Sequence, residues 1–345
     1  MSKIYIVAEI GCNHNGDYAT AKKMIDEAKF AGVDAVKFQT FKAEQLISKI
    51  APKAEYQLKV TNKNESQLDM TKKLELAYDD YEKLSAYALD LGLDVFSTPF
   101  DFQSIDFLAS KKQIKWKIPS GEITNLPYLE KIAKLKIDNM EIILSTGMAN
   151  KSEIDFALNV FLENEFTKKS ITILHCNTEY PTPYKDLNLN TIKWFKDNYK
   201  GYKIGLSDHS EGFYSSVASA ALGIDFIEKH FTLDKDLPGP DHKASVNPNE
   251  LYHLCKGIRA VEMSMGNYEK AVTNSEAKNK IIARKSIVAK KKIEQGDTFS
   301  EDNITTKRPG NGISPMFWKD LIGKKSESEF NQDELIVDSR FKKQD

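Results

Sequence analysis

The sequence predicts an α/β protein in which a (β/α)8 TIM barrel is followed by a small, turn-rich second domain. Over the first 265 of the 345 residues, short β-branched runs alternate eight times with segments of helical periodicity. After residue 280 the alternation stops, and short strand-like pieces separated by Gly, Pro and Asn replace it. The alternative for the first part is a doubly wound open sheet. However, no Gly-x-Gly-x-x-Gly turn follows the first strand, and eight units exceed what that sheet needs.

The expected elements follow one another as strand, polar turn and helix. We expect strands at Ile4–Glu9, Ala35–Phe38, Asp94–Ser97, Ile114–Ile118, Glu141–Leu144, Ile171–His175, Lys203–Leu206 and Asp225–Ile227. We expect helices at Tyr18–Ala31, Tyr78–Leu91, Ser104–Ser110, Pro127–Leu135, Lys151–Glu163, Leu189–Asn198, Gly212–Leu222 and Asn249–Met265. With right-handed crossovers, these units close into a parallel barrel with the helices outside.

One insertion interrupts the alternation between the second strand and its helix. Residues 41–76 form a long, polar and lysine-rich connection. A connection of this length at the C-terminal end of a strand is usually functional or disordered. We expect it to fold partly over the mouth of the barrel.

The pattern divides the chain into three parts. Residues 1–265 are the expected barrel, and residues 266–280, GNYEKAVTNSEAKNK, are an expected linker. Residues 281–345 have room for one small domain with a marginal core of its own.

Composition and charge exclude several classes of function. Lys and Arg number 49 against 50 Asp and Glu, which leaves a net charge of -1 and argues against a general polyanion or nucleic-acid partner. Three cysteines without motif spacing argue for a reducing compartment. The apolar run Ile4–Ile10 is too short for a signal peptide or a membrane span and contains Glu9. We therefore expect a cytoplasmic protein without a membrane partner.

Polar groups stand at the C-terminal end of every predicted strand, where barrel enzymes carry their catalytic residues. Any one of them fits an ordinary loop residue, but the convergence of all eight ends on one rim predicts an active site. In chain order they are Glu9, Asn13 and His14; Lys37 and Gln39; Ser97 and Thr98; Lys117, Ser120 and Glu122; Ser145 and Thr146; His175, Asn177 and Thr178; Ser207, Asp208 and His209; and Glu228 and His230.

These residue types indicate a particular chemistry. Lys37 and Lys117, with the hydroxyls of Thr98, Ser120, Ser145 and Ser207, suit a phosphate and a carboxylate. Two imidazoles from adjacent strand ends, His209 and His230, could hold one divalent metal and leave positions open for substrate and water. Carboxylates available for proton transfer are Glu9, Glu122 and Asp241.

Other interpretations stay open for the same residues, including ordinary structural roles and a different catalytic role. Two histidines in a chain of this size are often ordinary surface or hydrogen-bonded residues. Lys117 could be a lysine extending from the barrel rim, or a Schiff-base lysine as in imine-forming aldolases. Such aldolases need no metal, whereas this sequence offers a metal pair.

Ten stretches of the chain resemble the bacterial sialic acid synthases, which make N-acetylneuraminate from N-acetylmannosamine and phosphoenolpyruvate. The likeness runs in order over nearly the whole chain. The stretches are AEIGCNHNG (Ala8–Gly16), AVKFQTFK (Ala35–Lys42), FSTPFD (Phe96–Asp101), KIPSGEITNLPYL (Lys117–Leu129), LSTGMA (Leu144–Ala149), LHCNTEYPTP (Leu174–Pro183), GLSDHS (Gly205–Ser210), IEKHFTLD (Ile227–Asp234), GPDHKAS (Gly239–Ser245) and KRPGNGIS (Lys307–Ser314).

The resemblance implies an architecture and an assembly. Members of the family have a barrel and a C-terminal domain similar to type III antifreeze proteins, called the SAF domain. They form a swapped homodimer in which each SAF domain caps the partner's barrel, and residues 281–345 fit that role. An ice-binding function does not follow, because a fold does not fix a function.

The resemblance also implies roles for single residues. His209 and His230 would hold Mn²⁺, with Mg²⁺ or Co²⁺ as alternatives. The catalytic carboxylates would be Glu9, Glu122 and Asp241. Phosphoenolpyruvate would be bound by Lys37, Gln39, Thr98, Lys117, Ser120, Ser145 and Ser207. The sugar would be bound by Tyr180, Asp241 and Arg308, the last reaching over from the partner's SAF domain. Thr178 departs from some members, which carry Asn there, so no contact is assigned to it.

The resulting hypothesis is a metal-dependent transferase, an N-acetylneuraminate synthase. It would condense phosphoenolpyruvate with N-acetylmannosamine and water, with C–O cleavage and a tetrahedral intermediate. The alternative within the family is an N,N'-diacetyllegionaminate synthase that uses 2,4-diacetamido-2,4,6-trideoxymannose. HCNTEYPTP, AEIGCNHNG and KRPGNGISPM favour the N-acetylneuraminate branch. No extra basic cluster supports a 9-phosphate synthase. The alternative from another class is a non-catalytic sugar-binding protein.

Overall fold

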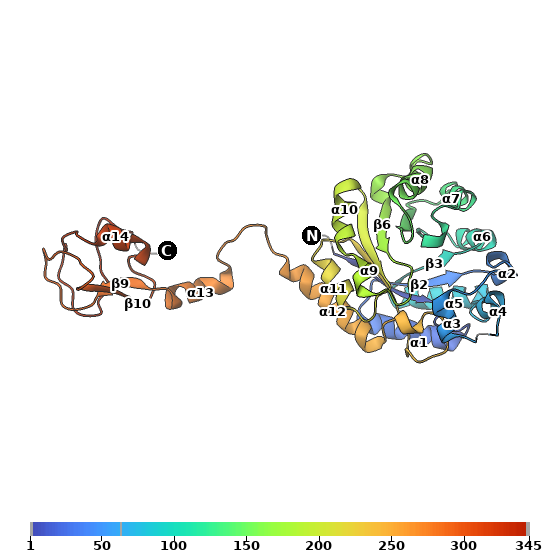
Figure 1. Cartoon of the computed structure of the whole chain (residues 1–345), viewed down its shortest axis with the longest axis horizontal. Helices are drawn as coiled ribbons and strands as arrows, with labels where there is room; N and C mark the ends of the chain where they lie inside the picture. Colours follow the sequence, from blue (N-terminus) through green and yellow to red (C-terminus); the bar gives the residue numbers. More distant parts are fainter. Residues whose placement is uncertain (1–2, 63, 343–345) are drawn as a thin grey trace. The chain divides into compact units, whose positions relative to one another are not determined.

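The computed structural model describes residues 3–62 and 64–342, and the chain divides after Gly266 into two compact units (Figure 1). Within the described residues, the first unit is built on an eight-stranded parallel sheet. Its strands are β1 (Tyr5–Gly11), β2 (Ala35–Thr40), β3 (Asp94–Pro99), β4 (Lys115–Ile118), β5 (Glu141–Ser145), β6 (Ile171–Cys176), β7 (Lys203–Asp208) and β8 (Phe226–His230).

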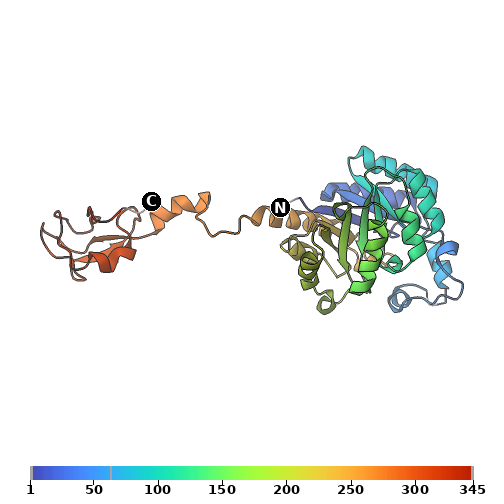
Figure 2. The ribbon, with the colours of Figure 1, turned by 90° about the horizontal axis from the view of Figure 1, so that it is seen from above.

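The strand order closes the sheet into the predicted barrel. The order is β3-β2-β1-β8-β7-β6-β5-β4, so the first strand pairs in parallel with both the second and the eighth. The two end strands, β3 and β4, also contact each other. Figure 2 shows the same strands from above, with helices around them. The TIM-barrel prediction is therefore confirmed.

Helices surround the strands and end where local sequence dictates. On α1, the Asp17 carboxylate accepts the Thr20 amide, and Gly32 ends the helix in the left-handed conformation at φ 88°. The helices outside the barrel are α1 (Tyr18–Ala31), α5 (Tyr78–Asp90), α6 (Phe102–Ser110), α7 (Leu126–Ala133), α8 (Lys151–Leu162), α10 (Asn190–Asn198), α11 (Tyr214–Ala220) and α12 (Pro248–Ser264). None of the helices in the described ranges has the length and apolarity needed to cross a membrane.

Short helices occupy the loops at the C-terminal ends of the strands. The insertion of residues 41–76, predicted only as a polar connection, contains α2 (Ala43–Leu46), α3 (Glu55–Val60) and α4 (Gln67–Lys72). Each is too short to show helical periodicity in the sequence. Three further short helices at these ends are η1 (Ser120–Glu122), α9 (Tyr184–Leu187) and η3 (His242–Ala244), whereas η2 (Lys168–Ser170) directly precedes β6.

The second unit has a core of its own. Strands β9 (Ser286–Ala289) and β10 (Ile304–Lys307) pair antiparallel, and Ile287, Phe299 and Ile336 are among the buried core residues. Its helices are α13 (Asn274–Ala283), η4 (Pro315–Phe317) and α14 (Trp318–Leu321). The stretch predicted as a linker, residues 266–280, overlaps α13.

Candidate active site

One cavity of about 180 Å³ lies at the C-terminal ends of the barrel strands and gathers most of the predicted site residues. We call it the strand-end cavity. It is lined by Glu9, Lys37, Gln39, Thr98, Lys117, Ser120, Ser145, Tyr180, Ser207, His209 and His230, together with Glu228, Cys176, Thr178, Phe100, Pro119 and Gly121.

The two-residue period of β-strands explains how this cavity forms. Side chains two residues apart on one strand point to the same face of the sheet. An apolar layer fills the barrel interior with Val7, Ala35, Phe96, Ile143, Leu174 and Phe226. Two residues further along the same strands, the cavity lining begins with Glu9, Lys37, Thr98, Ser145, Cys176 and Glu228.

Two lysines and two glutamates form a buried charge network on the cavity floor. Lys37 Nζ lies 2.7 Å from Glu9 Oε2 and 3.4 Å from Glu228 Oε2, and it donates to Thr98 Oγ1 at 2.9 Å. Lys117 Nζ lies 3.4 Å from Glu228 Oε1. All four charged side chains are at most 5% exposed. We call these four residues the floor.

The floor gives its two glutamates different acidities. Burial raises the pKa of Glu9 to about 7, with Lys37 opposing the rise and Glu228 adding to it. Burial alone would raise the pKa of Glu228 too, but Lys117 and Lys37 outweigh it and hold that pKa well below its usual range. Glu228 therefore stays ionised, while Glu9 can exchange a proton near neutral pH.

Hydroxyl groups around the floor supply further donors. Ser207 Oγ donates to Glu228 Oε1 at 2.8 Å, and Ser120 Oγ accepts the Gly147 amide at 3.0 Å. Ser145 Oγ is buried and has no hydrogen-bond partner among the described residues. A buried hydroxyl without a partner is unfavourable, so its presence beside two lysines indicates a place for an anionic ligand.

The two predicted metal ligands lie together above the floor. Their ring centroids are 5.3 Å apart. His209 Nδ1 lies within hydrogen-bonding distance of the Asn177 carbonyl, which assigns the proton to Nδ1 and leaves the lone pair on Nε2. His230 Nδ1 is buried without a hydrogen-bond partner among the described residues. Burial, His209 and Lys37 hold the pKa of His230 well below its ordinary value, so its ring stays neutral.

This pair fits a divalent ion, although the surrounding residues add no third protein ligand. Within residues 3–62 and 64–342, no group of three or more His, Cys, Asp and Glu side chains could hold a metal. The two imidazoles, one of them with a buried nitrogen that lacks a hydrogen-bond partner, are suitable first-row metal ligands. An ion held by them would keep most of its coordination positions for substrate and water.

A fully buried ion pair lies on the other side of the same two strands. Asp208 and Lys229 are register partners on β7 and β8, and their charged groups are 3.4 Å apart with at most 1% exposure. Asp208 accepts the Ser210 amide and the Ser216 hydroxyl. Because His209 and His230 directly follow these residues, the pair helps to fix the ends of both strands.

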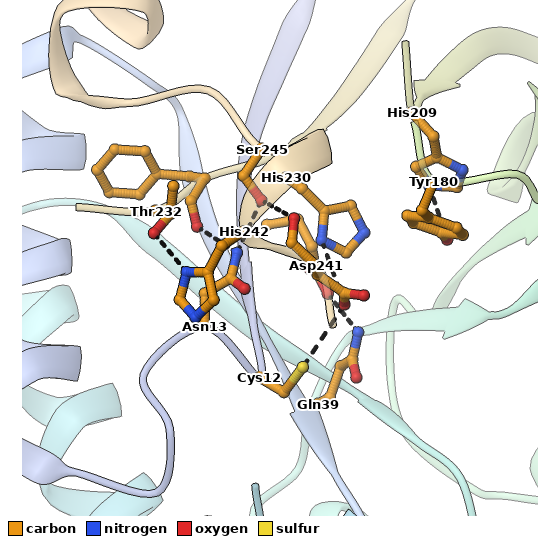
Figure 3. Close-up of polar contacts among 12 residues, drawn as sticks. Cys12, Asn13, Gln39, Tyr180, His209, His230, Thr232, Asp241, His242 and Ser245 are labelled. Atoms are coloured by element: carbon orange, nitrogen blue, oxygen red, sulfur yellow. Dashed lines mark hydrogen bonds and ion pairs between the residues drawn. The ribbon is translucent and has the colours of Figure 1, made fainter. Parts of the chain in front are cut away.

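Asp241 lies beside the histidines rather than on the floor. Its Oδ2 is 3.8 Å from His230 Nδ1 and 3.5 Å from Cys12 Sγ (Figure 3). Tyr180 donates from the opposite side, with its hydroxyl 3.1 Å from His209 Nε2. Asp241 and Tyr180 thus lie next to the two histidines, where the sugar was expected.

Besides Asp241, two predicted residues are not among those that line the strand-end cavity. Glu122 lies on η1, and its carboxylate accepts the Asn125 side-chain amide at 2.6 Å. Arg308 is exposed in the second unit, where its Nε donates to the Ala283 carbonyl at 3.1 Å. The predicted roles of both residues remain predictions.

Sequence reasoning placed Glu228 on the rim but assigned it no role. The structure puts it between Lys37 and Lys117, as their shared counter-ion. The signal was present, because Glu228 lies two residues before His230 on one strand and therefore shares its face. Cys176 lies opposite, 3.7 Å from His209 Nδ1.

Comparison with known proteins places this site in a family. Residues 24–270 match the NeuB family and residues 284–342 match the SAF domain. The chain belongs to the NeuB family. It is 52% identical over 336 residues to the N,N'-diacetyllegionaminic acid synthase of Campylobacter jejuni, covering 97% of this chain and 99% of that one. The resemblance to the sialic acid synthases and the SAF prediction are thereby confirmed.

Other relatives extend the comparison. The chain is 40% identical to the N,N'-diacetyllegionaminic acid synthase of Legionella pneumophila, covering 92% of this chain and 89% of the relative. It is 33% identical to the human N-acetylneuraminate-9-phosphate synthase, with coverages of 97% and 91%. Among solved structures, the N-acetylneuraminic acid synthetase of Leptospira borgpetersenii is 31% identical with a TM-score of 0.70, covering 81% of this chain and 90% of that one.

Proposed function

We propose that this protein is an N,N'-diacetyllegionaminate synthase. It would condense phosphoenolpyruvate with 2,4-diacetamido-2,4,6-trideoxymannose and water, and release phosphate. The observation that carries the choice of sugar is the 52% identity, over nearly the full length of both chains, to a relative with that name. The motif comparison favoured the N-acetylneuraminate branch instead, so N-acetylneuraminate synthase is the second candidate.

The floor supports the phosphoenolpyruvate part of the proposal. Lys37 and Lys117 supply two buried positive charges, and Ser120, Ser145 and Ser207 supply hydroxyls around them. Point charges together with directional donors bind phosphate and carboxylate groups well. Glu228 balances the positive charges of Lys37 and Lys117. The phosphate or carboxylate of phosphoenolpyruvate would take over part of that pairing.

The reaction balances with groups that the cavity provides. The C3 carbon of phosphoenolpyruvate gives its electron pair to C1 of the open-chain sugar, and the alkoxide formed there takes up the proton that the added water releases through Glu9. Water adds to the resulting cation at C2 and gives a proton to Glu9, whose pKa of about 7 suits a base. The tetrahedral intermediate then breaks the C2–O bond to its phosphate, and the C2 hydroxyl gives its proton to the leaving phosphate as the C2 carbonyl forms. Holding both reactants in one cavity makes this bimolecular step effectively unimolecular.

A divalent ion is part of the proposal. His209 and His230 would hold it, and when bound it supplies Lewis-acid polarisation of the sugar carbonyl. Mn²⁺ is our first choice, with Mg²⁺ or Co²⁺ as alternatives. Tyr180 and Asp241 would orient the sugar, since both lie within hydrogen-bonding or ion-pair distance of the histidines.

We further propose a homodimer in which Arg308 of one subunit completes the site of the other. Mixing the inactive variants Lys117→Ala and Arg308→Ala tests this directly. In a swapped dimer, mixed pairs contain one site with both residues, so part of the activity returns. If each chain completes its own site, the mixture stays inactive. Light scattering of the wild type should give the mass of two chains.

A phosphate-release assay tests the activity. Purified protein with Mn²⁺ and phosphoenolpyruvate is given either the diacetamido sugar or N-acetylmannosamine. We expect phosphate release with both sugars and a higher kcat/KM for the diacetamido sugar. A higher value for N-acetylmannosamine would favour the second candidate. Sugar binding without phosphate release would favour the non-catalytic sugar-binding protein.

A further inference from the structure

A second cavity adjoins the strand-end cavity, and we call it the side pocket. It has a volume of about 230 Å³ and shares Gln39, Phe100 and Tyr180 with the strand-end cavity. The shared walls place the side pocket directly beside the strand-end cavity, which makes it a candidate space for the far end of a substrate that reacts in the first. The remaining walls come mainly from the insertion of residues 41–76.

The insertion is held against the site by an aromatic stack. Tyr56 of α3 stacks on Tyr180 with ring centroids 5.4 Å apart, and Tyr180 stacks on His209 at 4.1 Å. At the base of the insertion, Glu75 accepts the Ala43 amide at 2.7 Å. The side pocket is thus a built part of the barrel mouth.

Most of the side-pocket wall is apolar. Phe41, Leu46, Met70, Leu74 and Phe100 line it. Such a wall favours methyl groups, because burying apolar surface is favourable. A substrate hydroxyl placed against this apolar part of the wall would lose its hydration without burying apolar surface in return.

One polar atom in this pocket lacks a partner. Gln67, the first residue of α4, has its Oε1 buried without a hydrogen bond among the described residues. The backbone around it is fixed, since Thr71 Oγ1 donates to the Gln67 carbonyl and Ser66 caps the helix. A buried amide oxygen without a partner is unfavourable and indicates a ligand that donates to it. A carboxamide carries donors and an acceptor, so an amide ligand can pair with it in either orientation.

We propose that the side pocket binds the acetamido group at C4 of the sugar, and that Gln67 is the residue that selects it. This inference rests on the proposed function. The acetamido N–H donates to Gln67, and the acetamido methyl packs on the apolar wall. N-acetylmannosamine has a hydroxyl at C4, so it leaves that wall unfilled. The insertion would therefore determine which acylated mannose the floor acts on.

The test is Gln67→Met, which keeps the length of the side chain and removes its amide. The matched control is Gln45→Met, the same change at an exposed position on α2. For Gln67→Met we expect kcat/KM for the diacetamido sugar to fall about tenfold, the usual effect of a lost buried hydrogen bond. The value for N-acetylmannosamine should stay within about twofold, and the control should change neither.

A second variant acts from another wall of the pocket. Leu74→Phe narrows the side pocket. Like Gln67→Met, it should lower kcat/KM for the diacetamido sugar relative to the value for N-acetylmannosamine. Thermal melting confirms that each variant is folded. An equal loss for both sugars, or no loss for either, in folded Gln67→Met would overturn the assignment of Gln67. A wild type that prefers N-acetylmannosamine would instead overturn the proposed function, so the two failures are distinguishable.

Discussion

The floor and the side pocket meet at Gln39, Phe100 and Tyr180 but are built in opposite ways. The floor comes from strand ends and consists of four buried charges, Glu9, Lys37, Lys117 and Glu228. The side pocket comes from the short helices of an insertion and is mostly apolar. Barrel strands can hold charged groups at fixed spacing, whereas an inserted segment can change without disturbing the strands. The difference suggests a division of labour, in which the floor carries the reaction and the side pocket carries the choice of sugar.

The largest expected effect comes from removing the metal. We expect EDTA to abolish phosphate release with both sugars, because the polarising ion serves the reacting end of either one. Adding Mn²⁺ back should restore activity. Turnover that resists the chelator would contradict the metal assignment of His209 and His230, and would favour an imine mechanism at Lys117.

Removing one floor lysine should have the next largest effect. Lys117→Ala takes away a buried donor for the phosphate or carboxylate of phosphoenolpyruvate. In comparable sites, removal of one such donor costs about 3 kcal/mol of transition-state stabilisation. We expect kcat to fall at least about a hundredfold for both sugars equally. The control is Lys115→Ala on the same strand, where the lysine forms a partly exposed ion pair with Asp94. Near-normal kcat in Lys117→Ala would show that the floor does not hold phosphoenolpyruvate.

The pH dependence should report on the floor and not on the side pocket. A base is active when deprotonated, and burial raises the pKa of Glu9 to about 7. We therefore expect kcat/KM to rise with pH up to about 7 and to fall about tenfold per pH unit well below it. The residual activity of Glu9→Gln should lack this acid limb, whereas Gln67→Met should keep it. An acid limb that persists in Glu9→Gln would assign the proton transfer to another group.

The smallest expected effect concerns the aromatic contact that holds the insertion in place. Tyr56→Ala removes its stacking on Tyr180, which is worth about 1 kcal/mol. We expect kcat/KM for the diacetamido sugar to fall about fivefold, with the KM for phosphoenolpyruvate unchanged. Steady-state kinetics with each substrate varied in turn checks this. A rise in the KM for phosphoenolpyruvate would show that the two regions are not independent.

The floor was largely predictable from the sequence, because barrel topology brings strand ends together. The rim prediction included too many residues, however, since alternate side chains face away from the barrel interior. His175 lies close to the Leu187 carbonyl, Asp208 pairs with Lys229, and Ser97 contacts Thr40. Applying the two-residue period to each strand would have removed these three and shown that Glu228 faces the cavity together with His230.

The side pocket could not be predicted in the same way. Helices α2–α4 are four to six residues long, which is too short for a periodic signal. The position of Gln67 in the pocket depends on how these turns pack over the barrel, and no local pattern encodes that packing. The sequence indicated only that the insertion lies near the barrel mouth.

The division of labour is tested most directly by calorimetric titration of phosphoenolpyruvate, without sugar, into the wild type, Lys117→Ala and Gln67→Met. We predict that Lys117→Ala weakens phosphoenolpyruvate binding at least about tenfold, because the floor loses a charge. For Gln67→Met, whose change lies in the side pocket, we predict wild-type affinity. Equal weakening in both variants, or wild-type affinity in Lys117→Ala, would contradict the account.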